Sequence, residues 1–409
     1  MSYNAVLVKR NNILSTLKLL KLNTSSNKSK LANRLGLTNV TMNSIINDLL
    51  EKGIVNNEGN AESSGGRKAA LYCLNQSCFY VGGVYMAIHK IVVTVYSFGL
   101  EPVHRAIWRG NVNDLTIDEC VAKICELLFG VLHEINRSLE DLIGMGISVP
   151  GIVNYDTGNI ANLPKLHKWK HIPLRDLLEK ELNLPIFIDN DMNANMLYLK
   201  WNNVVKEDTS VFISLNGGIG AGMLINGELY RGNNGVSGEF GHMRVKLNGL
   251  ACRCGSSGCL ELYASDLFLL ERILAQAKQQ PQSKLFHYHS QGNQAEDYQA
   301  VKTAKDEAWL AEIFNEGIGY LSICLGAILS SIAPKEIIIQ SDWLEAMPEF
   351  SQELIDNLFA STPYFTRYDV KLTTNDIDNI AELGPGAIAL DHFLTNLINN
   401  PLLDFICSE

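Results

Sequence analysis

Between residues 10 and 50, apolar side chains recur every three or four positions, which is the period of amphipathic helices. The spacing predicts a first helix around Ile13–Leu20, a short second helix that Ser29 caps and Gly36 ends, and a third helix that Thr38 caps. The inward positions of the third helix would be Met42, Ile45, Ile46 and Leu49. Two helices joined by a tight glycine turn are typical of a helix-turn-helix, in which the exposed start of the last helix enters the DNA major groove.

Two short apolar runs follow, at Ile54–Val55 and Ala69–Leu74, and the polar stretch between them is rich in glycine. This pattern predicts a two-stranded wing that presents Arg67 and Lys68 to phosphates or the minor groove. The predicted DNA-contacting residues are Thr38, Asn39, Val40, Thr41, Asn43, Ser44, Arg67 and Lys68. The alternative is a helical dimerisation or packing module with solvated lysines. Agreement between cap, turn, charge and wing favours DNA binding.

From Phe79 onward the apolar runs become short and continuous, which predicts strands. A first round has strands at 79–87, 90–97 and 103–108, a helix at 117–136 and a strand at 142–149. A second round has strands at 210–215, 222–225 and 336–339 and helices at 265–278 and 307–333. Three strands, a helix and a strand are the order of the ribonuclease-H-like sheet of sugar kinases and actin-like ATPases. Residues 279–304 resemble a surface excursion, with His287 and His289 solvated.

Bulk composition adds a contrast between the two ends of the chain. Its 409 residues predict two or three domains. Residues 1–75 carry ten Lys and Arg against four Asp and Glu, a net of +6, which leaves −16 for the remainder of a chain whose total is −10. A basic head on an acidic body indicates two parts with different partners. The uncharged stretch 317–333 contains Gly, Ser and Cys, which favours a buried core helix over a membrane span.

The segment 239–261 contains His242, Cys252, Cys254 and Cys259. Three thiolates and an imidazole match the tetrahedral ligand set of structural Zn²⁺, and nearby glycines would let the backbone fold around the ion. Four protein ligands leave no open position for an activated water, so the expected role is structural. The chain opens without a basic region followed by an apolar one, so nine cysteines favour a reducing, cytoplasmic setting.

Five motifs carry a family resemblance. They are Val149-Pro150-Gly151, Ile188 to Ala194, Asn226 to Gly232, Gly238 to His242, and Cys252 to Glu261. Their order and spacing are similar to those of the ROK family, which groups sugar kinases with sugar-responsive repressors. The resemblance spans essentially the whole chain, and the basic head resembles that of the family's repressors, whereas kinase members lack such a head.

The resemblance implies an α/β protein in which an N-terminal winged helix-turn-helix precedes a two-lobed ribonuclease-H-like domain of the actin and sugar-kinase type. The expected domains are 1–75 for DNA binding, 76–190 for the first lobe and 191–383 for the second lobe, which includes the zinc loop at 239–261. A C-terminal helix at 384–398 is a candidate to complete the first lobe.

The resemblance also implies a sugar site formed by Asn190, Asp191, Glu239, His242 and Glu261. In the family's kinases the aspartate of the Asn-Asp pair takes a proton from a sugar hydroxyl, and Asp191 is the equivalent here. His242 would bind zinc through one ring nitrogen and face the sugar with the other. The alternative for Asn190 and Asp191 is an Asx turn after a buried strand.

The phosphate side departs from the family's kinases. Residues Tyr85 to Lys90 stand where the kinases have Asp-x-Gly-Gly-Thr-Lys, Asn216-Gly217-Gly218 where they have Gly-Thr-Gly, and Gln340-Ser341 where they have a Gly-Gly turn. Phosphoryl transfer depends on positioning and charge stabilisation, so these losses predict no catalytic residues.

The combined expectation is a cytoplasmic, sugar-responsive transcriptional regulator that represses by binding operator DNA. It would be a homodimer or a dimer of dimers, with a small sugar or sugar phosphate as effector, structural zinc as cofactor and no membrane partner. Two alternatives stay open. One is a ROK-type sugar kinase with an accessory DNA-binding head, and the other is a repressor that a protein partner controls.

Overall fold

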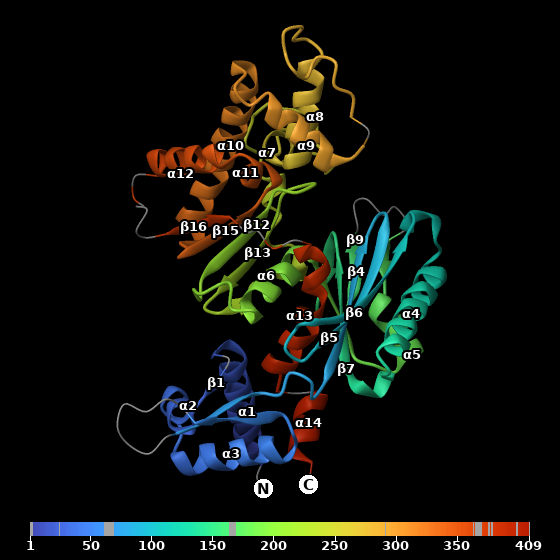
Figure 1. The fold of residues 1–409 in the computed structure, drawn as a ribbon, viewed down its shortest axis with the longest axis vertical. Helices are drawn as coiled ribbons and strands as arrows, with labels where there is room; N and C mark the ends of the chain where they lie inside the picture. The colour runs from blue at the N-terminus through green and yellow to red at the C-terminus, as the bar shows by residue number, and fades with distance from the viewer. Residues whose placement is uncertain are drawn as a thin grey trace. The chain divides into compact units, whose positions relative to one another are not determined.

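The computed structural model describes residues 3–23, 25–60, 69–162, 169–290, 292–362, 364, 370–374, 377, 379–397 and 400–408. The chain divides into two compact units (Figure 1). Unit 1 comprises Met1–Val204 together with Asn379–Glu409, and unit 2 comprises Val205–Asp378. The division therefore falls after residue 204, later than the lobe boundary expected at 190/191. Arg67 and Lys68, at the tip of the expected wing, lie outside the described residues.

The N-terminal part of unit 1 is a helical layer against a small antiparallel sheet of order β1-β3-β2. Its elements are α1 (Tyr3–Asn23), β1 (Ser25–Ser26), α2 (Lys28–Leu35), α3 (Asn39–Glu51), β2 (Val55–Asn60) and β3 (Ala70–Leu74). The apolar positions expected to face inward are buried, among them Ile13, Leu17, Met42 and Ile46. Gly36 ends α2 in the left-handed conformation with φ 64°, as the sequence predicts.

The expected cap of α2 is wrong by two positions. Asn27 caps this helix, because its Oδ1 accepts a hydrogen bond from the backbone N–H of Lys30 at 2.8 Å, and Ser29 lies inside the first turn. The cap of α3 is the expected one, since Thr38 Oγ1 accepts from the N–H of Thr41 at 3.1 Å. Both helices thus begin at a side chain that satisfies an otherwise unpaired backbone donor.

The main sheet of unit 1 has the order β11-β7-β4-β5-β6. Its strands are β4 (Tyr80–Ala87), β5 (Lys90–Ser97), β6 (Pro102–Arg109), β7 (Leu142–Val149) and β11 (Ile186–Asn190). Strands β4, β5 and β6 are antiparallel neighbours, whereas β7 and β11 join the other side in parallel. One face is covered by α4 (Ile117–Glu134) and α5 (Leu174–Leu182), whose apolar residues share a buried core with the sheet.

The other face of this sheet is covered by α6 (Asp191–Trp201) and α13 (Ile380–Thr395), which pack against each other (Figure 1). Glycines allow the close approach, since a Cβ on Gly146 of β7 would lie 2.0 Å from the carbonyl oxygen of Pro385. Asp391 of α13 accepts hydrogen bonds from Trp201 Nε1 at 3.0 Å and Lys200 Nζ at 3.2 Å. The helix expected at 384–398 thus spans 380–395 and belongs to unit 1.

Smaller elements of unit 1 had no clear sequence signal because they are short. A three-stranded sheet comprises β8 (Ile152–Asn154), β9 (Asn159–Asn162) and β10 (Lys170–Ile172). Two 3-10 helices are η1 (Val112–Asp114) and η2 (Leu139–Asp141), and α14 (Pro401–Cys407) follows α13.

Unit 2 repeats the strand arrangement of unit 1 in a sheet of order β14-β13-β12-β15-β16. Its strands are β12 (Ser210–Ser214), β13 (Gly220–Ile225), β14 (Glu228–Leu229), β15 (Glu336–Gln340) and β16 (Lys371–Thr374). Again the first three strands are antiparallel neighbours, β15 pairs with β12 in parallel, and β16 pairs with β15 in parallel. Two sheets with one strand order are the duplicated ribonuclease-H-like arrangement that the sequence predicts.

The helices of unit 2 are α7 (Glu261–Ala264), α8 (Asp266–Ala277), α9 (Gln294–Thr303), α10 (Ala308–Ile332), α11 (Asp342–Ala346) and α12 (Pro348–Ser361), with 3-10 helices η3 (Asn233–Gly235) and η4 (Phe240–His242). Among the described residues, α10 has the length and apolar character of a membrane span, but its apolar window is 61% buried in the core of unit 2. The prediction that residues 279–304 form a surface excursion is wrong in part, because α9 packs Val301 into that core.

Candidate functional site

Four metal-binding side chains of unit 2 converge on one point. His242 ends η4, Cys252 and Cys254 lie in the following loop, and Cys259 precedes α7. Their ligand atoms all lie within 4.8 Å of one another, with 3.6 Å between His242 Nδ1 and Cys252 Sγ and 3.7 Å between the sulfurs of Cys254 and Cys259. A tetrahedron with metal–sulfur bonds of about 2.3 Å has edges of about 3.8 Å. The donor set and its separations therefore fit Zn²⁺.

The loop backbone is shaped by its own hydrogen bonds and by one glycine. Gly258 adopts φ 73°, and a Cβ there would lie 1.8 Å from the carbonyl oxygen of Lys246. Its N–H donates to the Leu250 carbonyl at 2.8 Å, and its carbonyl accepts from the N–H of Val245 at 2.9 Å. Burial raises the pKa of the Cys259 thiol, so metal binding must displace a proton there. The four residues would hold the ion in a closed site, where it fixes the loop and activates no water.

Two glycines place Glu239 and His242 against strand β13. A Cβ on Gly238 would lie 2.0 Å from the carbonyl oxygen of Ala221, and one on Gly241 would lie 2.3 Å from that of Ile219. The Gly-Glu-Phe-Gly-His motif thus owes its glycines to close backbone packing. His242 turns Nδ1 toward Cys252, and its Nε2 lies 3.9 Å from Glu239 Oε2.

The carboxylates of Glu239 and Glu261 face different surroundings. Partial burial raises the pKa of Glu239, and the charge of Glu261 adds to the rise, while His242 and Arg253 oppose it. The Glu261 side chain is only 4% exposed and pairs with Arg253, whose Nη2 lies 3.0 Å from Oε2 and 2.8 Å from Oε1. Among the described residues, Oε1 has no hydrogen-bond donor in suitable geometry. Arg253 thus neutralises this buried carboxylate through a hydrogen bond to Oε2 and an ion pair that includes Oε1.

Sequence reasoning missed Arg253. It lies between two metal-binding cysteines, in Cys-Arg-Cys, and its partner follows eight residues later. The available signal was the presence of a cation, Arg253, in the same short motif that ends in the acid Glu261. A second neighbour is Gly218, where a Cβ would lie 2.7 Å from Glu261 Oε2. Gly218 thus leaves room for the Arg253–Glu261 pair.

Asn190 and Asp191 lie together in unit 1, where β11 ends and α6 begins. The side chain of Asn190 is engaged at both ends, since Oδ1 accepts from the N–H of Met192 at 2.8 Å and Nδ2 donates to the Gly151 carbonyl at 2.9 Å. The Asx cap weighed as the alternative is therefore present. Asp191 is the first residue of α6, where the helix dipole favours a carboxylate. Burial, together with the charges of Asp191 and Glu382, raises the pKa of Tyr85.

Of the five expected sugar-binding residues, two are thus neighbours in unit 1 and three surround the metal-binding loop of unit 2.

The phosphate-side segment of unit 1 is a tight hairpin. Ala87 pairs with Lys90, so Ile88 and His89 form a two-residue turn between β4 and β5. Their carbonyls accept hydrogen bonds from Val112 at 2.8 Å and Gly110 at 3.1 Å. Lys90 Nζ turns to Glu382 of α13 at 2.5 Å. The backbone and the lysine of this turn therefore have partners within unit 1.

The two phosphate-side segments of unit 2 are joined by side chains. Asn216 Nδ2 donates to Asp342 Oδ1 at 3.1 Å, and Ser341 Oγ donates to Asp266 Oδ1 at 2.8 Å. The N–H of Asp342 also donates to Asp266 Oδ2 at 2.6 Å. Asp266 is fully buried, and this burial raises its pKa to about 7. Two carboxyl groups thus occupy the junction of these segments.

The described residues expected to contact DNA lie at the start of α3. Asn39, Val40, Asn43 and Ser44 are exposed there, and Val40 is 79% exposed despite its apolar side chain. Thr38 and Thr41 are joined by their hydroxyls at 2.9 Å and by the cap hydrogen bond. These two threonines therefore have a structural role at the start of the helix.

The model of the ROK family matches residues 85–362. The xylose repressor of Bacillus subtilis (strain 168) is 29% identical over 391 residues, which cover 95% of this chain and 97% of that protein. The crystal structure of a ROK family transcriptional regulator, homolog of E. coli MLC protein, covers 98% of this chain and 99% of that one with a TM-score of 0.79 at 20% identity. A ROK family glucokinase from Streptomyces griseus, in complex with glucose and AMPPNP, covers 76% of this chain and 98% of that one with a TM-score of 0.61 at 24% identity. The chain belongs to the ROK family.

Proposed function

We propose that this protein is a cytoplasmic, sugar-responsive transcriptional repressor whose N-terminal part binds operator DNA as a winged helix-turn-helix. The observation that carries the proposal is the exposed start of α3, on a head that precedes the ROK domain. A protein named as a xylose repressor is similar over nearly the full length of both chains, head included. The head's net charge of +6 suits phosphate contacts.

The effector is a small sugar or sugar phosphate. A sugar ring presents several hydroxyls that directional acceptors and donors can bracket. In unit 2, Glu239, the Nε2 of His242 and the carboxylate of Glu261 offer such groups, and in unit 1 Asn190 and Asp191 offer others. Structural zinc on His242, Cys252, Cys254 and Cys259 would hold the unit 2 groups in a fixed relation.

Several contacts favour sensing over phosphoryl transfer. Asp266 and Asp342 join the two phosphate-side segments of unit 2, and a nucleotide phosphate placed there would meet carboxyl groups rather than free backbone donors. In unit 1, Ile88 adds a branched side chain to the hairpin turn, and Lys90 is engaged with Glu382. The rival function is a sugar kinase that uses Asp191 as base. A coupled assay for ADP release across hexoses and amino sugars, with turnover well above background, would establish that rival.

The test of the repressor function is operator binding by the full chain. Fluorescence anisotropy with a duplex from the chain's own upstream DNA should show binding at moderate salt, and Asn43→Ala should weaken it by about 1–3 kcal/mol if this side chain contacts a base. Asn47→Ala, one turn further along α3, is the matched control and should change affinity less. Absence of binding at every moderate salt concentration would reject the proposal.

The protein binds its operator as a homodimer or a dimer of dimers, because operators with two half-sites match two-fold symmetric proteins. Analytical ultracentrifugation measures the assembly. A repressor that a protein partner controls is the remaining alternative. Calorimetry that finds no sugar binding to the zinc-replete protein would favour it.

A further inference from the structure

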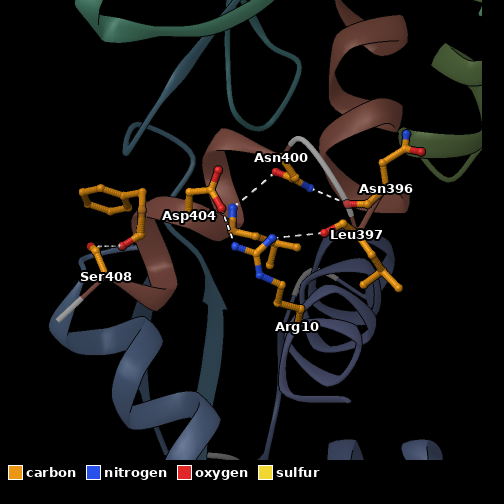
Figure 2. Close-up of polar contacts among 8 residues, drawn as sticks. Arg10, Asn396, Leu397, Asn400, Asp404 and Ser408 are labelled. Carbon is orange, nitrogen blue, oxygen red and sulfur yellow. Dashed lines mark hydrogen bonds and ion pairs between the residues drawn. The ribbon is translucent and has the colours of Figure 1, made fainter. Parts of the chain in front are cut away.

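The short helix α14 bridges the ROK part of unit 1 and the DNA-binding head. Asn400 is fully buried between α13 and α14, where its Nδ2 donates to the carbonyl of Phe393 at 2.7 Å. The same Nδ2 donates to the carbonyl of Asn396, also at 2.7 Å (Figure 2). Its Oδ1 accepts from the N–H of Leu403 at 3.3 Å. Leu402, Leu403 and Ile406 are buried. One amide side chain thus ties the end of α13 to the start of α14.

The opposite side of α14 contacts both outer helices of the head. Arg10 of α1 forms an ion pair with Asp404 and donates to the carbonyl of Leu397 at 3.2 Å (Figure 2). Lys52, the C-cap of α3, donates to the carbonyl of Ser408 at 3.0 Å, and its Nζ lies 5.4 Å from the centroid of the Phe405 ring. The helix that carries the expected base contacts is therefore held at its far end by α14.

Within unit 1, rigid elements connect α14 to the expected sugar residues. Asn190 caps α6 and Asp191 opens it. Helix α6 packs along α13, with a Cβ on Gly384 only 2.9 Å from the backbone of Ala194, and Asp391 accepts bonds from Lys200 and Trp201. A displacement of α6 cannot be absorbed at such close backbone contact, so α13 would move with it.

We propose that α14 couples the effector-binding state of α6 to the orientation of α3, with Arg10, Lys52 and Phe405 as positioning residues. The inference rests on the proposed function. The coupling requires two arrangements of unit 1, and the effector and the DNA must each bind these two arrangements with different affinity. Because such coupling is reciprocal, DNA binding at α3 must also alter α6. A helix that only braces the fold would add stability without transmitting this response.

The experiment uses reciprocity, so it does not depend on the identity of the sugar. Amide hydrogen exchange of the full chain is followed with and without the upstream duplex. In the wild type, the duplex should change exchange in α6 and α13 as well as in α3. In the Asp404→Ala/Phe405→Ala variant, the change at α3 should remain and the changes at α6 and α13 should disappear. Both replaced side chains are exposed, and Asp404→Ala alone is a milder second variant.

The matched control is Asp48→Ala. It removes a carboxylate that pairs with Lys9 at 3.0 Å, next to Arg10 on the same helix, without touching α14, and should behave like the wild type. D-xylose serves as the effector probe. The factor by which D-xylose weakens operator binding should be about tenfold or more smaller in the double variant than in the wild type. Duplex binding without a response at α6, or a response that survives in the double variant, overturns the coupling. Failure of the wild type to bind the duplex instead rejects the repressor function itself.

Discussion

At the scale of single residues, Arg253 links the metal-binding loop to a buried acid. Its guanidinium is 41% exposed, whereas its partner Glu261 is 4% exposed. A carboxylate that loses its cation inside a protein keeps its desolvation cost without compensation. Arg253 thus connects the loop to a residue of the proposed sugar site.

Arg253→Ala should therefore lower the free energy of unfolding by about 1–3 kcal/mol, a range discounted for the exposure of the arginine. The matched control is Arg272→Ala, because Arg272 is equally exposed but pairs with the more accessible Glu316. This control should cost less than about 1 kcal/mol. Urea unfolding of zinc-replete protein measures both, and equal losses would show that burial of Glu261 does not matter.

Asp266 predicts a pH dependence. Its pKa is about 7 in the folded protein against an ordinary 3.8, so the folded state holds a proton that the unfolded chain releases. The stabilisation is fully present below pH 3.8 and is lost as pH rises through 7. The free energy of unfolding of the wild type minus that of Asp266→Asn should therefore fall between pH 4.5 and 8, by about 1–4 kcal/mol. Subtracting the two free energies removes pH effects common to both proteins, such as metal release. A difference that stays constant between pH 4.5 and 8 would contradict the raised pKa of Asp266.

Residue-scale signals in the sequence were reliable where the physics is local. Thr38 and Gly36 could be predicted because a cap and a left-handed stop depend on neighbours within a few residues. The prediction of Ser29 as cap of α2 failed because Asn27, two residues earlier, can cap a helix equally well and holds that position. The partner of Arg253 was not predictable, because it depends on how the loop folds back.

At the scale of elements, two glycines of the metal-binding loop allow backbone strain to be distinguished from a steric clash of an added Cβ. Gly255 and Gly258 both have positive φ, at 91° and 73°. A Cβ on Gly255 would have no atom within 4 Å, whereas one on Gly258 would collide with the carbonyl of Lys246. Both substitutions impose backbone strain, but only one obstructs loop closure.

Gly258→Ala should lose bound zinc and lower the melting temperature, because the loop cannot bring Cys259 beside Cys254. Gly255→Ala should keep close to one zinc per chain and cost about 1–2 kcal/mol for its backbone conformation. Metal analysis of the purified variants, with thermal unfolding before and after chelation, measures this. Equal zinc content in the two variants would contradict the role given to Gly258.

Elements with continuous apolar runs could be located from the sequence, and β5 and β7 have the predicted bounds. Strands β8, β9 and β10 could not, because runs of three or four residues are too short to show a period. Helix α9 was obscured by the Gln- and His-rich residues before it, although Tyr298 and Val301 already had helical spacing.

At the scale of the whole molecule, positive and negative charge are separated along the chain, which bears on the proposed DNA binding. The head carries +6 and the remainder −16, so attraction to phosphates is confined to one part. The repeated strand order could be anticipated from two rounds of strands and helices. The return of residues 379–408 to unit 1 could not be established from the sequence, since it depends on packing against α6 and α1, far away along the chain.

Operator affinity should fall linearly on a logarithmic plot against salt concentration, because bound phosphates release counterions. Lys30→Ala removes an exposed cation of α2 and should reduce the slope by about 0.9 if that lysine contacts a phosphate. Lys278→Ala removes an exposed lysine of unit 2 and should leave the slope unchanged. Identical slopes in all three proteins would exclude Lys30 from the contact surface.

The position of α13 in the chain has a consequence for synthesis on the ribosome. The sheet of unit 1 is made early, but the helix that covers one of its faces follows the whole of unit 2. A nascent chain must therefore carry an uncovered apolar sheet face while some 175 further residues are translated, which takes about 9–35 s at about 5–20 residues per second. During that interval the head has been synthesised, but its contacts with α14 cannot yet form. A chain that stops before residue 380 would thus be a substrate for proteases and chaperones, and any DNA binding it retained would be unregulated.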